Sequence, residues 1–101
     1  MAVYTIQFTI GFDNTLSYRR RYQNFVAAAR KNAVMTWEGA TSNIVLATTE
    51  SIGSLALRLK QTVDARRDVF VIIDTVYKQA VTGGRYPGVN LFRLIPYIKK
   101  V

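Results

Sequence analysis

The strict alternation of residues 3–10 is the feature that most constrains the fold. Tyr4, Ile6, Phe8 and Ile10 fall on one side of this segment, and the residues between them are polar. Successive side chains of a β-strand point to opposite faces, so the segment predicts a strand with one buried face and one polar face. A sheet built on such a strand is covered by helices on its apolar side only.

A first helix is predicted over residues 17–31, where apolar residues recur at helical spacing. Asn14 or Ser17 can cap its start, because both side chains accept hydrogen bonds from free backbone amides. The apolar stripe consists of Tyr18, Tyr22, Phe25, Val26, Ala29 and Ala33. This stripe predicts which side of the helix faces the sheet.

A hairpin and a second helix follow the first helix. Residues 34–38 and 43–48 have strand composition and are separated by a turn-forming segment. The second helix begins at a cap, Thr49 or Ser51, and extends to about Thr62. Its apolar stripe excludes one leucine, Leu57, which is therefore expected to be exposed.

The fourth strand is predicted over residues 69–73, which are continuously apolar. Such a run indicates a strand that is buried on both faces or paired at an interface. Residues 74–81 are compatible with an extension of this strand. Gly83-Gly84 and Pro87-Gly88 predict a loop after it.

The predicted order of elements is βαββαβ, which is the ferredoxin-like arrangement of the α+β class. It gives a two-layer sandwich with an antiparallel sheet on one side and two helices on the other. The length predicts a single domain over residues 1–101, with a core at about 3–81 and a C-terminal extension at 82–101. Residues 89–101 fit either a helix interrupted by Pro96 or a final strand near residues 89–94.

Positive charge dominates the first helix. The chain carries 14 Lys and Arg against 6 Asp and Glu, a net charge of +8. No acid occurs between Asp13 and Glu38, whereas this stretch contains Arg19, Arg20, Arg21, Arg30 and Lys31. Without an acid nearby in the sequence, internal salt bridges do not account for these charges, and an anionic partner such as nucleic acid does. The alternative is a solvated helix face.

Four of these side chains are predicted to contact phosphates: Arg19, Arg20, Arg30 and Lys31. Contacts of this kind give an affinity that falls steeply with salt concentration. Base stacking on the open sheet face, as in RNA-recognition domains, is not expected, because the polar row of the first strand contains no aromatic residue.

The absence of His and Cys removes thiol and histidine catalysis, disulfides and zinc–thiolate sites. Two carboxylates that follow strands, Asp13 and Asp74, are the candidate catalytic residues, since magnesium in nucleases is held by carboxylate oxygens. No pair of acids has the spacing of a metal site, so no metal or other cofactor is predicted. Magnesium would be needed only if the protein is a nuclease.

The chain has no apolar run of about 20 residues, the length that spans a bilayer. Its first residues enter a strand pattern directly and lack the features of a signal peptide. We therefore expect a cytoplasmic protein that does not contact a membrane.

Several segments resemble the small ferredoxin-like nuclease superfamily, which includes the CRISPR spacer-acquisition adaptor, a virulence-associated toxin ribonuclease and short uncharacterised relatives. The similar segments lie within residues 4–76: Tyr4–Ile10, Trp37, Thr41–Val45, Thr48–Ser51, Leu59 and Asp68–Ile72. The resemblance implies a homodimer that handles nucleic acid. The family ends its first strand in Tyr-Asp, with the aspartate implicated in metal binding, whereas this chain has Phe8-Thr9. This departure argues against nuclease activity.

Three hypotheses follow. The leading one is a basic homodimer that binds nucleic acid, of unknown type, without cutting it. The second is a metal-dependent endonuclease of the endoribonuclease kind that uses Asp13 and Asp74. The third is an antitoxin-like or other protein-interaction module, in which Leu57 and residues 89–101 contact a protein partner.

Overall fold

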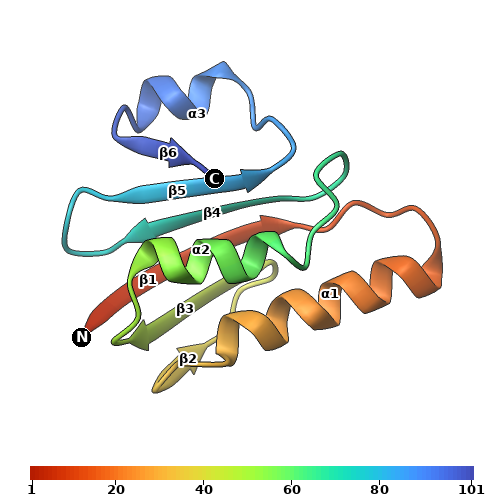
Figure 1. The fold of residues 1–101 in the computed structure, drawn as a ribbon, viewed down its shortest axis with the longest axis horizontal. Helices are drawn as coiled ribbons and strands as arrows, with labels where there is room; N and C mark the ends of the chain where they lie inside the picture. The colour runs from red at the N-terminus through yellow and green to blue at the C-terminus, as the bar shows by residue number, and fades with distance from the viewer.

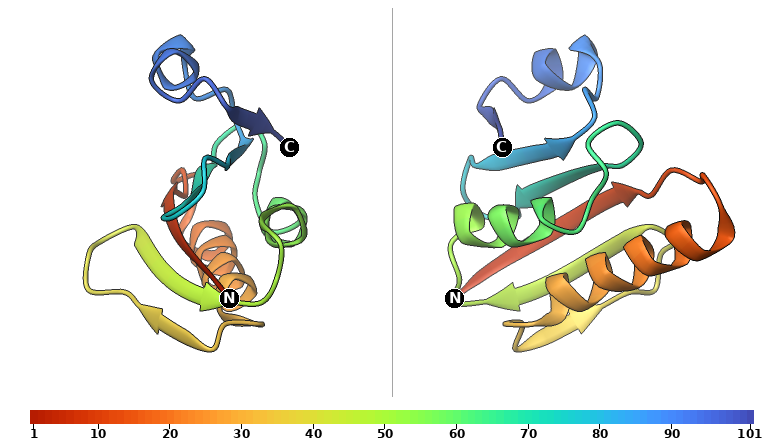
Figure 2. Two further views of the ribbon diagram at one scale, coloured as in Figure 1. Left: turned by 90° about the vertical axis from the view of Figure 1, so that its left-hand side faces the viewer. Right: turned by 45° about the vertical axis from the view of Figure 1, so that its right-hand side comes forward.

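Six strands form one mixed sheet, and two of the three helices cover one of its faces (Figures 1 and 2). The computed structural model describes all residues from 1 to 101. The elements are β1 (Ala2–Thr9), α1 (Thr15–Arg30), β2 (Met35–Trp37), β3 (Asn43–Thr48), α2 (Ile52–Lys60), β4 (Val69–Asp74), β5 (Ala80–Gly84), α3 (Val89–Leu94) and β6 (Ile98–Lys100). None of the helices combines the length and the apolar composition that crossing a bilayer requires.

Strand β1 lies in the middle of the sheet, whose order is β2-β3-β1-β4-β5-β6. It pairs antiparallel with both β3 and β4, and only the β5–β6 pair is parallel. The predicted alternation of β1 is confirmed, because Tyr4, Ile6 and Phe8 are buried while Gln7 and Thr9 are exposed. The apolar row faces α1 and α2, so burial of this row fixes the register of the sheet.

Both long helices begin at side-chain caps that the sequence predicts. Asn14 Oδ1 accepts a hydrogen bond from the Ser17 amide at 3.0 Å, and Ser51 Oγ accepts one from the Ser54 amide at 3.2 Å. Each bond satisfies one of the free amides at a helix start. The core lies between these helices and the sheet, where Phe25 of α1 packs against Phe8 and Phe70 at ring distances of 4.6 and 5.7 Å.

The sheet is larger than the four antiparallel strands that the sequence predicts, because the chain after β4 continues it. Residues 74–81 do not prolong β4. Asp74 ends the strand by accepting hydrogen bonds from the amides of Val76 and Tyr77, and the chain turns back into β5. Residues 89–94, which fit either a helix or a strand in the sequence, form the helix α3, and the short strand β6 after Pro96 is not predicted. The segment 82–101 is therefore part of the same sheet as the core.

The predicted loop at Gly83-Gly84 is wrong, since both glycines belong to β5. Gly83 lies directly against the ring of Phe70, where a Cβ atom would approach the ring Cζ to 2.4 Å. Gly84 has a φ of 90°, a backbone conformation that favours glycine. These glycines do not mark a loop here; they let β5 pack tightly on β4.

The face of the sheet away from α1 and α2 is mostly apolar, although the β1 row alone predicts a polar face. The register places Thr5 beside Val45 on one side and Ile73 on the other. Trp37 of β2 lies next to Val45 and is 56% exposed, so it lies outside the core. No side chain on this face of β1 to β4 is charged.

Candidate nucleic-acid interface

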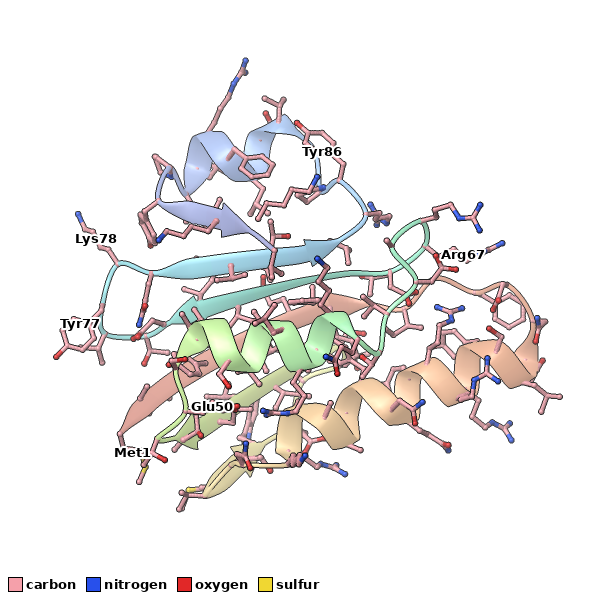
Figure 3. The ribbon with its side chains drawn as sticks, in the orientation of Figure 1. Met1, Glu50, Arg67, Tyr77, Lys78 and Tyr86 are labelled. Carbon is pink, nitrogen blue, oxygen red and sulfur yellow. The ribbon has the colours of Figure 1, made fainter.

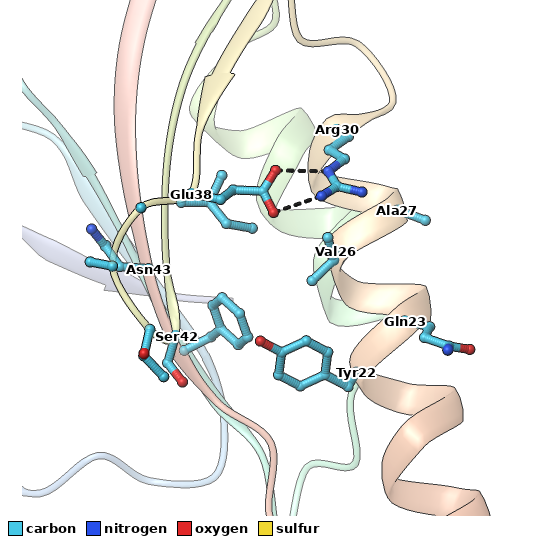
Figure 4. Close-up of a pocket in the computed structure, with 13 residues that line it drawn as sticks. Tyr22, Gln23, Val26, Ala27, Arg30, Glu38, Ser42 and Asn43 are labelled. Carbon is cyan, nitrogen blue, oxygen red and sulfur yellow. Dashed lines mark hydrogen bonds and ion pairs between the residues drawn. The ribbon is translucent and has the colours of Figure 1, made fainter.

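The four predicted phosphate contacts on α1 do not form one set. Arg30 is bound to Glu38 of the β2–β3 loop, with its Nε and Nη2 atoms each donating a 2.8 Å hydrogen bond to the carboxylate (Figure 4). The prediction that no acidic residue neutralises the positive charges of this helix is therefore wrong for Arg30. Its bidentate pair holds the guanidinium in a fixed position against the hairpin loop.

Arg21 is a second cation whose charge is compensated, and it is buried. Its guanidinium donates to Asp68 and, at 2.8 Å, to Asp13, and it also binds the carbonyl of Gly11 at 2.9 Å. Asp68 is fully buried and accepts further bonds from the amides of Gly11 and Asp64. This network joins α1 to both loops at one end of the sheet, so Arg21 has a structural role.

The other α1 cations are exposed and have no acidic partner, but they are far apart. Arg19 and Arg20 lie in the second turn of α1, whereas Lys31 follows its last residue. Eleven residues separate Arg20 from Lys31, a distance of about 16 Å along a helix. These three residues do not form one compact contact.

Most of the basic side chains in the protein have no acidic partner. Five of the six acids pair with a basic side chain, namely Asp13, Glu38, Glu50, Asp64 and Asp68. They engage only four of the fourteen cations. The ten cations that have no acid within 4.0 Å are Arg19, Arg20, Lys31, Lys60, Arg66, Lys78, Arg85, Arg93, Lys99 and Lys100.

Three of these ten converge on one groove, which we call the basic groove. Lys60 at the end of α2, Arg85 after β5 and Lys100 of β6 line a cavity of about 440 Å³. Its other lining residues are Val63, Ala65, Gly84, Tyr86 and Val101, so no acidic side chain faces it. The sequence does not predict this convergence, because the first and the last of the three cations are 40 positions apart in the chain.

The wall of the basic groove is held in place by backbone and aromatic contacts. The Arg85 amide donates a 2.7 Å hydrogen bond to the carbonyl of Asp68, which fixes the loop that follows β5. Tyr86, labelled near the top of Figure 3, stacks on Phe92 of α3 with ring centroids 5.8 Å apart and remains 58% exposed. The groove thus offers cations and an exposed aromatic ring, the two kinds of group that bind phosphates and bases.

The candidate catalytic carboxylates do not meet. Asp13 follows β1 at one end of the sheet, and Asp74 closes the β4–β5 turn at the other end (Figure 1). Polar hydrogens of Asn14 and Ser17, together with the Arg21 guanidinium, lower the pKa of Asp13 to about 2. A hydrogen bond from the Gln79 side chain and amides of the turn lower the pKa of Asp74. Both carboxylates are engaged in local structure.

Thr9, at the position where the resembled family has aspartate, is exposed at the end of β1. A threonine hydroxyl is a poor magnesium ligand compared with a carboxylate. No three Asp or Glu side chains lie close enough together to hold a metal ion.

No protein-family model, curated protein sequence or solved structure matches the chain.

Proposed function

We propose that this protein binds nucleic acid through its phosphates and does not cleave it. The observation that carries the proposal is the basic groove, where Lys60, Arg85 and Lys100 meet without an acid. Uncompensated cations that share one surface repel each other, and a polyanion relieves that repulsion when it binds. Each phosphate contact also releases counterions from the nucleic acid, which is the main source of sequence-independent affinity.

A titration of fluorescein-labelled RNA and DNA with the protein, read by anisotropy, tests the proposal. Three phosphate contacts predict that the logarithm of the association constant falls by about 2 to 3 for each tenfold rise in salt. Absence of binding at micromolar protein in low salt, or binding that does not change between about 50 and 200 mM salt, overturns it.

The positions of the carboxylates support binding without cleavage. The Asp13 carboxylate is engaged with Arg21, and the Asp74 carboxylate accepts hydrogen bonds within its turn. Incubation of the protein with RNA and DNA in magnesium or manganese should leave both intact. Cleavage that is lost in both Asp13→Ala and Asp74→Ala would instead establish the metal-dependent endonuclease.

We also propose that residues 2–74 form a ferredoxin-like unit of the resembled superfamily, enlarged at one edge. The order β2-β3-β1-β4 and its antiparallel pairing support this proposal, because they are those of a split βαβ fold. In this proposal β5, α3 and β6 are an addition, and the addition supplies Arg85 and Lys100 to the basic groove. The lack of cysteine accords with the cytoplasmic location that we propose for the protein.

Self-association is a second candidate function, favoured by the open face of the sheet. Met35 is 74% exposed and Trp37 is 56% exposed, beside half-buried aliphatic residues and without any charge. Exposed apolar patches of this kind mark protein contacts. We propose a homodimer through this face. Light scattering should give twice the monomer mass, and Trp37→Glu should return the monomer; a monomeric wild-type protein removes the proposal.

A further inference from the structure

A second groove runs along one side of α1, from the loop after β1 to the loop between β2 and β3. It consists of two cavities, of about 570 and 460 Å³, which share Tyr22 and Gln23 and therefore meet along the helix. Figure 4 shows the second of them, between α1 and the hairpin loop. We call the two cavities together the α1 groove. The α1 residues that line it are Thr15, Tyr18, Arg19, Tyr22, Gln23, Val26, Ala27 and Arg30.

The α1 groove is elongated along the helix because its lining residues recur every three to four positions along one helix face. From Thr15 to Arg30 the helix rises about 22 Å. A groove of this shape accommodates an extended chain more readily than a compact molecule. The question is which chain its chemistry suits.

Aromatic rings follow each other along the first part of the groove. The ring centroids of Phe12 and Tyr18 are 5.7 Å apart, those of Tyr18 and Tyr22 are 6.0 Å apart, and those of Tyr22 and Phe8 are 5.6 Å apart. The outermost ring, Phe12, is 69% exposed. Phe12 therefore offers a free ring face beside the half-buried Tyr18 and Tyr22, and nucleobases of any sequence stack on such faces.

The charges along the groove suit a polyanion. Arg19 lines the aromatic part and has no acidic partner. The one acid in the groove, Glu38, is bound by two hydrogen bonds to Arg30. Gln23 presents an amide, which can donate to and accept from a base edge. The backbone of an apolar peptide could hydrogen-bond to this amide, but such a peptide offers no negative charge to the Arg19 guanidinium, whereas a phosphate does.

We propose that the α1 groove binds an unpaired, single-stranded segment of nucleic acid, with bases stacked on Phe12 and Tyr18 and a phosphate bound by Arg19. This inference rests on the proposed nucleic-acid binding and specifies its ligand. Bases of a duplex already stack on each other and pair, so they have no free face for Phe12. Single strands should therefore bind more tightly than duplexes of the same length.

The test is anisotropy with a labelled single-stranded RNA, the matching single-stranded DNA and a blunt duplex of equal length. Phe12→Ala should weaken single-strand binding about tenfold and leave duplex binding unchanged, while Phe12→Trp should retain it. The matched control is Leu16→Ala, which removes an exposed apolar side chain near Phe12, on α1 but outside the groove. Arg19→Ala should weaken binding more than Arg20→Ala, since only Arg19 lines the groove.

The outcomes separate this inference from the proposed function. If the wild-type protein binds strongly but Phe12→Ala and Leu16→Ala behave alike, the α1 groove is not the base-binding site, and the basic groove stands. If an apolar peptide competes with RNA for the wild-type protein and not for Phe12→Ala, the ligand class is wrong. If the wild-type protein binds no nucleic acid, both proposals fail. Phe12→Trp and Arg19→Ala keep the test decisive should Phe12→Ala not fold.

Discussion

The two basic regions of this molecule differ in where their acids lie. Helix α1 has no acid in its own stretch of sequence, yet Arg21 and Arg30 find partners from other parts of the chain. The basic groove is lined by Lys60, Arg85 and Lys100, which come from three separate parts of the chain, and no acidic side chain lines it. Charge balance along a sequence therefore does not report charge balance in space. The second region is the stronger candidate for phosphate binding.

The largest expected effect comes from breaking the buried pair on the α1 side. Asp68→Ala leaves Arg21 buried with only Asp13, and it also removes acceptors for the amides of Gly11 and Asp64. The expected loss in the free energy of unfolding is about 3–5 kcal/mol, as for other broken buried pairs. Urea denaturation measures it.

The matched control is Glu38→Ala, which breaks the exposed pair with Arg30 instead. Its cost should be at most about 1 kcal/mol, because exposed ion pairs contribute little. Equal losses for Asp68→Ala and Glu38→Ala would contradict the distinction between a structural and a surface cation on α1.

The next effect concerns the C-terminal side, where β5 must lie close to Phe70. Gly83→Ala places a Cβ atom 2.4 Å from the ring and should cost about 1–3 kcal/mol of stability through overpacking. Gly53→Ala in α2 is the control, since no atom lies within 4 Å of its added Cβ. That change should stabilise the protein by about 0.5–1 kcal/mol. Thermal melting of the two variants distinguishes them, and a neutral Gly83→Ala would contradict the close packing.

Acid should weaken the fold through the carboxylates that pair or accept hydrogen bonds. The pKa of Asp13 is about 2 in the folded protein, below the value of about 3.9 for an unfolded aspartate. A depressed pKa contributes stability above the unfolded value, and this contribution is lost as the pH falls toward 2. Glu38, Glu50, Asp64 and Asp74 also have lowered pKa values and act in the same direction. Denaturation midpoints should fall steadily below pH 4; a midpoint that is constant from pH 5 to 2 would refute the assignment.

The smallest expected effect comes from removing the acidic partner of Arg30 on α1. Glu38→Gln removes the charge that Arg30 faces while keeping a side chain of similar size. Affinity for single-stranded RNA should rise by a factor of about 2 to 5, and its dependence on salt should steepen by up to about 1 in the logarithmic slope. Glu50→Gln is the control, because Glu50 pairs with Arg58 outside both grooves.

Local patterns predicted most of the fold. The β1 alternation, the caps at Asn14 and Ser51 and the existence of strand β4 depend on residues close in the sequence, and all four are confirmed. The expected burial of β4 on both faces is not observed, because only alternate residues of the strand are fully buried. The C-terminal strands were missed because the Gly83-Gly84 pair has turn composition, and only its contact with Phe70 explains the glycines.

The candidate site was harder to predict because it depends on distant residues. Arg21 binds an aspartate 47 positions away, so its pairing has no local signal. Arg21 lies three residues after Tyr18 and four residues before Phe25, which places it near the apolar stripe of the helix. This position was the one indication in the sequence that Arg21 is not a surface cation. The spacing of Lys60, Arg85 and Lys100 in the sequence does not indicate that these three side chains line one groove.

The most direct test of the central claim is the salt dependence of RNA binding by two triple variants that each lose three positive charges. One variant replaces Lys60, Arg85 and Lys100 of the basic groove with alanine. The other replaces Lys31, Lys78 and Arg93 with alanine; these three residues are exposed, have no acidic partner and lie outside the basic groove. Figure 3 labels Lys78 at the left edge of the molecule, away from Tyr86. We predict that the first variant lowers the salt slope by about 2 to 3 and that the second changes it by less than about 1. Equal slopes for the two variants would show that net charge, and not the basic groove, determines binding.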